Sequence, residues 1–189
     1  MIEKTLVLLK PDTIQRNLVG QIISRLENTG LKIIALKMTR PDDNLTERHY
    51  RLSPEWVKDV AAKTRKAHES KGKKLSETDK EIAKRIQTWL KDYLKEGPVL
   101  AIVFEGPHAV EIVRKIVGNT EPRSSLPGTI RGDFMVDSYQ MADYKKRPLR
   151  NLIHASGTRE EAQYEIPIWF KPEELHEYIS QLDKYFKHD

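Results

Sequence analysis

Unbroken hydrophobic runs mark the strands of this chain. Residues 5–9 form such a run, and Pro11 ends it. The run is too short for a buried helix, and proline cannot donate a hydrogen bond to a sheet, so the pattern predicts a central strand. Residues 98–104 give the strongest strand signal, and residues 135–137 indicate a short strand later in the chain. Alternating hydrophobic and polar positions over 34–38 predict a half-buried strand.

Hydrophobic residues three or four positions apart predict the helices. Gly30 and Gly118 end two of them, because glycine readily takes the left-handed conformation that closes a helix. Thr158 can cap a third helix, which runs through Glu165. A terminal helix is predicted over 172–187, with its hydrophobic side facing inward. The hydrophobic positions behind these predictions are Ile22, Ile23, Leu26, Val110, Val113, Val117, Leu175, Ile179 and Leu182.

The composition changes between about residues 53 and 95. Two segments, each with one hydrophobic side, flank a basic middle around Gly72. The pattern predicts an inserted helical hairpin whose second helix has a cap at Ser76. We expect the basic middle to be solvated, although a nucleic-acid-binding protein would use such a charge run. Its basic residues are Lys63, Arg65, Lys66, Lys71, Lys73 and Lys74.

The order of these elements predicts the fold class. The predicted order is strand, helix, strand, helices, strand, helix and strand. This order matches a split βαβ, ferredoxin-like α+β sandwich. We expect an antiparallel four-stranded sheet with helices on one face. A length of 189 residues fits a single domain, residues 1–189, that carries the hairpin as an insertion.

Composition narrows the possible functions. The 33 basic and 28 acidic residues give a net charge of +5, which suits an anionic ligand. The sequence has no cysteine, so disulfides and thiolate metal sites are excluded. The first hydrophobic run is too short for a signal peptide or a membrane span. The sequence therefore predicts a cytoplasmic protein with no membrane partner.

The candidate chemistry lies in residues 150–157. His154 precedes small residues that leave room for a substrate, and imidazole can act as a nucleophile or as an acid and base near neutral pH. Asn151 is close enough in sequence to face the same cleft. Taken alone, such a histidine is more often a packed or surface residue, and Lys10 is as readily a solvated lysine at a strand end. Two glycines flank Arg131 and give its loop close access to an anion.

Three segments together carry a specific resemblance. Residues 10–12, 127–134 and 151–156 occur in the order and composition of a nucleoside diphosphate kinase. The similarity to this family covers 4–50 and 96–170, so the 53–95 hairpin and a loop at 138–149 are additions. It implies a ferredoxin-like fold and transfer of the terminal phosphoryl group of a nucleoside triphosphate, such as ATP, to a nucleoside diphosphate. The implied route is a ping-pong reaction through a phosphohistidine, with Mg²⁺ carried by the nucleotide.

The resemblance also implies a role for each matching residue. His154 is the nucleophile, and Glu165 holds its other ring nitrogen. Tyr50 lies near the transferred phosphoryl group, and Ser156 is the serine beside the histidine. Cations from separate elements fit a reaction that spreads negative charge over phosphoryl oxygens. The residues that match phosphate- or sugar-binding positions are Lys10, Arg114, Thr120, Arg131 and Asn151.

Two positions depart from the family. Gly157 stands where the family commonly has aspartate, which removes one charge beside the histidine. Lys58 stands where the family has an aromatic residue against the base. We hypothesise that the hairpin forms a lid and that Trp56 stacks on the base instead. The alternative is that Trp56 packs with Trp89 in the hairpin's own core.

The sequence thus predicts a nucleoside diphosphate kinase. The alternatives are a catalytically silent nucleotide-binding regulatory module on the same fold, and a nucleic-acid-binding protein that uses the basic hairpin. The matched cations, retained together with His154 and Glu165, argue against a catalytically silent module. We also expect no nucleic-acid partner. The family implies a homo-oligomer, a tetramer or hexamer built from dimers. The histidines outside the matching motifs are expected to be dispensable: His49, His68, His108, His176 and His188.

Overall fold

The computed structural model describes residues 2–69, 72, 74–181 and 183–186. Predictions for four residues fall outside these ranges: Lys71, Lys73, Leu182 and His188.

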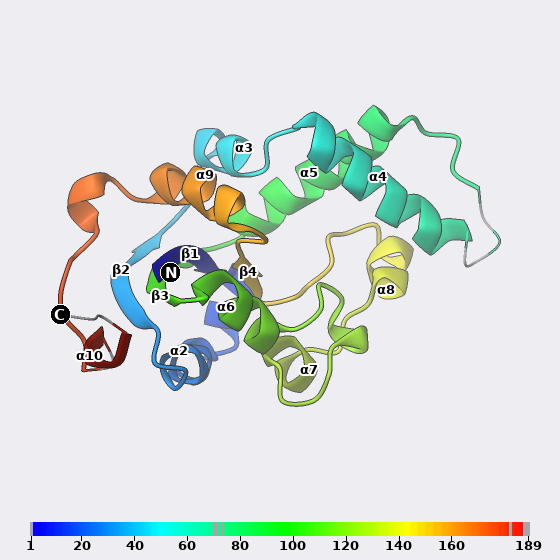
Figure 1. The fold of residues 1–189 in the computed structure, drawn as a ribbon. Helices are drawn as coiled ribbons and strands as arrows, with labels where there is room; N and C mark the ends of the chain where they lie inside the picture. The colour runs from blue at the N-terminus through cyan, green and yellow to red at the C-terminus, as the bar shows by residue number, and fades with distance from the viewer. Residues whose placement is uncertain (1, 70–71, 73, 182, 187–189) are drawn as a thin grey trace.

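A four-stranded sheet forms the centre of the molecule, with strand order β2-β3-β1-β4 (Figure 1). Every paired neighbour in it is antiparallel, so the predicted antiparallel four-stranded α+β fold is confirmed. The strands are β1 (Ile2–Leu9), β2 (Lys32–Thr39), β3 (Val99–Pro107) and β4 (Ile153–Ala155).

Helices connect and cover the strands. They are α1 (Pro11–Gln15), α2 (Val19–Glu27), α3 (Asp43–His49), α4 (Pro54–Glu69), α5 (Asp79–Lys95), α6 (Ala109–Val117), α7 (Ile130–Phe134), α8 (Tyr139–Tyr144), α9 (Arg159–Trp169) and α10 (Asp183–Phe186), with 3₁₀ turns η1 (Pro122–Ser124) and η2 (Pro172–Glu174).

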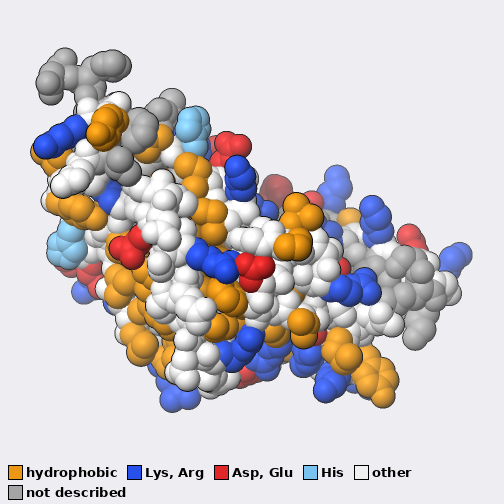
Figure 2. Space-filling model, turned by 90° about the horizontal axis from the view of Figure 1, so that it is seen from below, with side chains coloured by type: hydrophobic (Ala, Val, Ile, Leu, Met, Phe, Trp, Pro, Cys, Tyr) orange, Lys and Arg blue, Asp and Glu red, His pale blue; other side chains and the backbone are white. Residues whose placement is uncertain are grey.

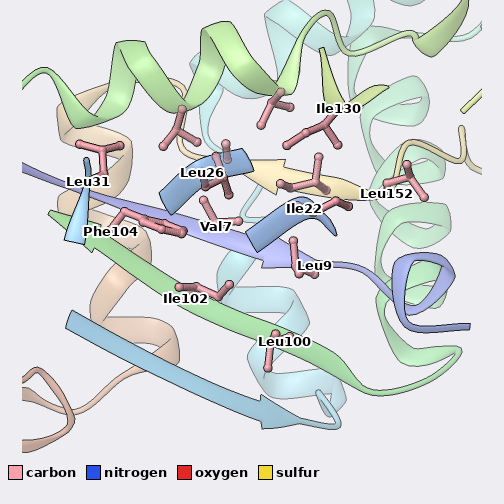
Figure 3. Packing of buried hydrophobic residues seen from close by; sticks show 14 of the residues in the cluster. Val7, Leu9, Ile22, Leu26, Leu31, Leu100, Ile102, Phe104, Ile130 and Leu152 are labelled. Carbon is pink, nitrogen blue, oxygen red and sulfur yellow. The ribbon is translucent and has the colours of Figure 1, made fainter. Parts of the chain in front are cut away.

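The sheet is covered on both faces, so the prediction of helices on one face only is wrong. Val7 and Leu9 of β1 pack in one hydrophobic cluster with α2 and α6 (Figure 3). Leu6 and Leu8 point the other way, into a second cluster with α9 and the end of α5. Figure 1 shows α3, α5 and α9 on one side of the sheet and α2, α6 and α7 on the other. A continuous hydrophobic run is the pattern expected of a strand buried on both faces.

The two helices of the hairpin, α4 and α5, pack against each other as predicted. The second helix is capped by Thr78 rather than by Ser76. The Thr78 hydroxyl accepts the N–H of Glu81, and the Glu81 carboxylate accepts the N–H of Thr78, so the two residues satisfy donors that the helix leaves unpaired. Helix α5 also contacts α1 and α3, which joins the hairpin to the body of the domain.

The fourth strand is β4 and not residues 135–137. Ile153 and Ala155 of β4 pair with β1, whereas Val136 is 93% exposed and pairs with no strand. The following segment, predicted as a polar loop, contains the short helix α8, because the Ser138 hydroxyl accepts the N–H of Met141 and caps it.

The predicted terminal helix over 172–187 is wrong. Of its described residues, Pro172–Glu174 form η2, residues 175–181 are irregular, and Asp183–Phe186 form α10. Contacts with the strand β2 hold the irregular stretch instead. The N–H of His176 donates to the carbonyl of Ile34, and the Tyr178 hydroxyl donates to the carbonyl of Ile33. Ile179 is 74% exposed rather than inward.

Candidate active site

A strained turn leads into β4 and shapes the site. Leu152 is fully buried and has a φ of 66°, a left-handed conformation that costs a residue other than glycine on the order of 1–3 kcal/mol. Hydrogen bonds hold it there. Its N–H donates to Asp12 Oδ2 at 3.2 Å, and its carbonyl accepts from the Lys10 N–H at 2.8 Å and the Thr13 hydroxyl at 2.6 Å. The turn thereby ties the segment before β4 to the residues that follow β1.

Lys10 lies at the end of β1, buried against this turn. Its Nζ donates to Asn151 Oδ1 at 2.7 Å, so the structure brings these two predicted site residues together. Burial, together with the positive charges of Arg131 and Arg150, lowers the pKa of Lys10 to about 7, while the Asp12 carboxylate partly opposes them. An anionic ligand would restore the lysine's charge.

Arg131 holds two backbone segments together at the site, the end of α6 and the segment that enters β4. Its guanidinium donates to the carbonyls of Gly118 at 3.1 Å, Asn151 at 3.2 Å and Ile153 at 2.6 Å. Burial and the nearby Arg114 lower its pKa to about 10, so it remains a cation at neutral pH. The predicted loop around it contains the short helix α7, which Thr129 caps by accepting the N–H of Gly132. Arg131 therefore supplies charge and also fixes the residues on either side of Leu152.

His154 and Glu165 form the pair that the family resemblance implies. His154 Nε2 lies 2.9 Å from Glu165 Oε1, close enough for a hydrogen bond but not well aligned for one. The Ser156 hydroxyl donates to Glu165 Oε2 at 2.6 Å. Burial alone would raise the pKa of Glu165, but His154, His49 and Ser156 lower it to about 2. The carboxylate thus faces the buried Nε2, and Nδ1 is the ring nitrogen that does not face it.

Sequence reasoning missed His49, which lies directly behind His154. The two rings meet edge to face at 4.6 Å, and His49 Nδ1 accepts a hydrogen bond from Trp169 Nε1 at 3.3 Å. Burial, with a smaller effect of His154, lowers the pKa of His49 to about 3, so its ring is neutral. This contact with His154 argues against the prediction that His49 is dispensable. The available signal was its place immediately before the matched Tyr50.

Tyr50 is buried at the end of α3, and its carbonyl accepts a hydrogen bond from Gln87 Nε2 at 2.6 Å. Burial and the charge of Glu165 raise the pKa of Tyr50, which keeps its hydroxyl protonated. Thr120 is exposed, and its carbonyl accepts from Asn151 Nδ2 at 3.0 Å.

The other predicted binding residues lie further out. Trp56 is half-buried in the first turn of α4, where its backbone N–H donates to the Ser53 hydroxyl. Among the described residues, Trp56 forms no hydrogen bond or ring contact with the cluster around His154. Arg114 is exposed and lines a pocket of about 600 Å³ together with Gly157 and Thr158.

A carboxylate lies beside Gly157, although the glycine has no side chain of its own. Glu161 Oε2 accepts the Gly157 N–H at 2.7 Å, and a Cβ added to Gly157 would lie only 2.6 Å from the same oxygen. The carboxylate of Glu161 thus lies next to position 157. The Glu161 carboxylate therefore offsets the missing charge of the aspartate that the family commonly has at this position.

The residues present fit a metal that arrives on the nucleotide. His49, His154 and Glu165 have ligand atoms within 4.8 Å of one another, but two of these three are imidazoles, and Mg²⁺ prefers oxygen. Asp12 and Glu165 already accept hydrogen bonds from the protein. Nucleotide phosphates would therefore supply most of the oxygen ligands.

An imidazole oriented by a carboxylate, beside a buried lysine and arginine, defines a phosphotransferase with a histidine nucleophile. The sequence profile described as nucleoside diphosphate kinase matches residues 3–62 and 57–175. The chain belongs to the nucleoside diphosphate kinase family, and its activity is phosphoryl transfer from nucleoside triphosphates to nucleoside diphosphates.

Individual relatives agree with the family match. The chain is 45% identical to the nucleoside diphosphate kinase of Pyrobaculum aerophilum over 179 residues, which cover 92% of this chain and 98% of that protein. A crystal structure of an NDP kinase from the same organism has a TM-score of 0.89 at 44% identity, over 94% of this chain and 100% of that one. A transition-state mimic of the Borrelia burgdorferi enzyme with vanadate and ADP has a TM-score of 0.80 at 35% identity, over 97% and 96% of the two chains.

Nucleotide binding is expected to drive proton uptake by Lys10. The pKa of Lys10 is about 7 without ligand, so the side chain is mostly neutral at about pH 8. Phosphate oxygens favour the ammonium and raise its pKa, so binding should take up close to one proton per nucleotide. Calorimetry in buffers of different ionisation enthalpy measures this uptake.

The control for this measurement is Lys10→Met, titrated at a higher protein concentration. It keeps the proton exchange of the nucleotide itself and lacks that of the lysine. Equal proton uptake by the two proteins would show that Lys10 is charged before the nucleotide binds.

Proposed function

We propose that His154 Nδ1 carries the phosphoryl group between two nucleotides. In the first half-reaction Nδ1 attacks the terminal phosphorus, the bond to the bridging oxygen breaks, and the nucleoside diphosphate leaves with that oxygen. In the second, a terminal oxygen of another diphosphate attacks the phosphorus and the N–P bond breaks. The observation that carries the proposal is the pairing of Glu165 with Nε2, which leaves Nδ1 as the nucleophile.

The surrounding residues bind the nucleotide. Arg131 and Lys10 stabilise the charge that spreads over the phosphoryl oxygens, and Arg114 and Thr120 bind the phosphates from the outer side. Asn151, in contact with Lys10, binds the sugar hydroxyl with it. The protonated hydroxyl of Tyr50 donates to the group in transfer. Mg²⁺ bound to the phosphates would neutralise part of their charge.

The test of this proposal is transfer of label from γ-labelled ATP. The full chain should retain the label in an acid-labile, base-stable form and release it when any nucleoside diphosphate is added. A catalytically silent regulatory module would bind nucleotide and remain unlabelled. Failure to acquire label while ATP binds would therefore favour the silent module.

Trp56 is proposed to stack on the base, a contact that tolerates every base because each has a π-face. Stacking contributes roughly 1–3 kcal/mol per base. Trp56→Ala should therefore raise the KM for nucleotides on the order of 10-fold, with little change in kcat or in melting temperature. Steady-state kinetics with two different bases, together with a melting curve, measure these effects.

The matched control is Trp89→Ala, on the other helix of the hairpin, where Trp89 contacts Arg85. If Trp56→Ala lowers the melting temperature as Trp89→Ala does and leaves KM unchanged, Trp56 belongs to the hairpin core.

Self-association is proposed on the evidence of exposed hydrophobic side chains on an edge strand. Strand β2 is at the edge of the sheet and exposes 48% of Leu36 and 58% of Met38, as expected of a surface that another chain covers. The face shown in Figure 2 also carries hydrophobic side chains among lysines and arginines. We propose a homo-oligomer, a tetramer or hexamer of dimers.

The chain is proposed to be a single domain located in the cytoplasm. Residues 1–189 would form one kinase domain, with the 53–95 hairpin and the 138–149 segment as insertions. Within the described residues, no helix has the length and hydrophobicity needed to cross a bilayer. We place the protein in the cytoplasm, with nucleoside di- and triphosphates as its partners and no nucleic acid.

A further inference from the structure

Helix α5 of the hairpin reaches the phosphate site through Tyr93. This residue lies in the last turn of α5 and is fully buried. The Lys10 ammonium lies 4.8 Å from the centroid of its ring, and the Arg150 guanidinium 4.4 Å from it. Glu96, just beyond the same helix, pairs with Arg150 through both carboxylate oxygens. The end of the hairpin thus lies directly beneath two cations.

The hydroxyl of Tyr93 contacts the strained turn before β4. It accepts the N–H of Asn151 at 3.3 Å. Burial raises the pKa of Tyr93, and the facing Asp12 carboxylate raises it further, so the hydroxyl is a proton donor toward Asp12. Asp12 in turn accepts the N–H of Leu152. The Tyr93 hydroxyl therefore links Asn151, at the start of the turn, to Asp12, which holds the N–H of Leu152.

The ring offers Lys10 a contact that favours its charged form. The face of an aromatic ring attracts an ammonium, and the attraction is strongest where water is excluded, as it is here. The groups that face Lys10 come from each element packed around it: Tyr93 from α5, Asp12 from α1, His49 from α3, Arg131 from α7, and Arg150 and Asn151 from the segment before β4. Two of these groups are cations, so the ring offsets part of their repulsion.

We propose that Tyr93 is a positioning residue of the phosphate site. Its ring favours the charged form of Lys10 and holds that side chain in place, and its hydroxyl holds Asn151 in the orientation that meets the nucleotide. Tyr93 touches no substrate itself and acts through these two residues. The inference rests on the nucleotide site proposed above, and it makes the base of the hairpin part of that site.

Two substitutions separate the ring from the hydroxyl. Tyr93→Phe removes the hydroxyl and keeps the ring. Tyr93→3,4,5-trifluorophenylalanine also lacks the hydroxyl and is nearly the same size, but its fluorines weaken the attraction of the ring face for a cation. Both fill the same buried space, so both proteins are expected to fold. Tyr178→Phe is the matched control, because it removes a hydroxyl that donates to the carbonyl of Ile33, away from Lys10.

The ring is tested by NMR titration of the Lys10 ammonium in the ligand-free full chain. We expect the pKa of Lys10 to be lower by roughly half a unit or more in the trifluorophenylalanine protein than in Tyr93→Phe. A purely structural role of Tyr93 would leave the two values equal, which would overturn the proposal for the ring. This readout needs no catalysis, so it stands apart from the label transfer that tests the proposed function.

The hydroxyl is tested by kinetics in the same proteins. Tyr93→Phe should lower kcat on the order of 10-fold, because the buried N–H of Asn151 loses its partner and the turn shifts. The control Tyr178→Phe should keep the wild-type kcat. Wild-type kcat in Tyr93→Phe, or an equal loss in Tyr178→Phe, would overturn the proposal for the hydroxyl.

Discussion

Replacing His154 with alanine will abolish the phosphoenzyme. The ring is held with Nε2 against Glu165 and His49 behind it, and alanine has no atom that can take its place. The neighbouring hydroxyl of Ser156 already donates to Glu165 and is fully buried, so it cannot serve instead. Incubation with γ-labelled ATP should leave this variant without label, while the wild-type chain retains it.

The matched control is His176→Ala, because this residue is exposed and its backbone N–H donates to the carbonyl of Ile34 in the edge strand β2. It should be labelled at the wild-type level. Acid-labile, base-stable label that persists on His154→Ala would mean that another residue is the nucleophile.

Replacing Glu165 with glutamine should lower kcat while leaving nucleotide affinity nearly unchanged. The carboxylate has a pKa of about 2, so it is ionised throughout the neutral range and stabilises positive charge on the imidazole. Glutamine keeps the shape and loses that charge. We expect a fall in kcat on the order of 10-fold or more with a steady KM, measured by steady-state kinetics.

Glu160→Gln is the control for this substitution. Glu160 lies on the same helix, α9, and is exposed. Its replacement should leave kcat unchanged. If Glu165→Gln weakens nucleotide binding but keeps the wild-type kcat, the carboxylate acts on the nucleotide rather than on His154.

The fold was predictable where local pattern and tertiary structure agree. Residues 6–9 are hydrophobic at every position and fully buried, and such a run is the pattern of a strand buried on both faces. The fourth strand was misplaced because β4 has only three residues, and its pairing with β1 depends on contacts distant in sequence. The C-terminal segment was misread as a helix for the same reason. Its hydrogen bonds to Ile33 and Ile34 of β2 outweigh its helical spacing.

In the site, too, the residues that lie in short motifs could be predicted, and those that depend on contacts distant in sequence could not. His154, Lys10 and Arg131 lie in short motifs whose residue types state their chemistry, and the structure places all three around one turn. His49 and Tyr93 could not be found this way. Each acts through packing against a residue from another element, and no spacing along the chain records that contact.

The hairpin has consequences for protein engineering. At its base, Gln87 and Tyr93 of α5 hold Tyr50 and the turn before β4, so shortening the hairpin there would disturb the site. At its tip, Gly72 is exposed, has a φ of 67° and has open space around it. Exposed turns of this kind accept foreign sequence most readily. The tip is therefore the place to graft a tag or a second domain.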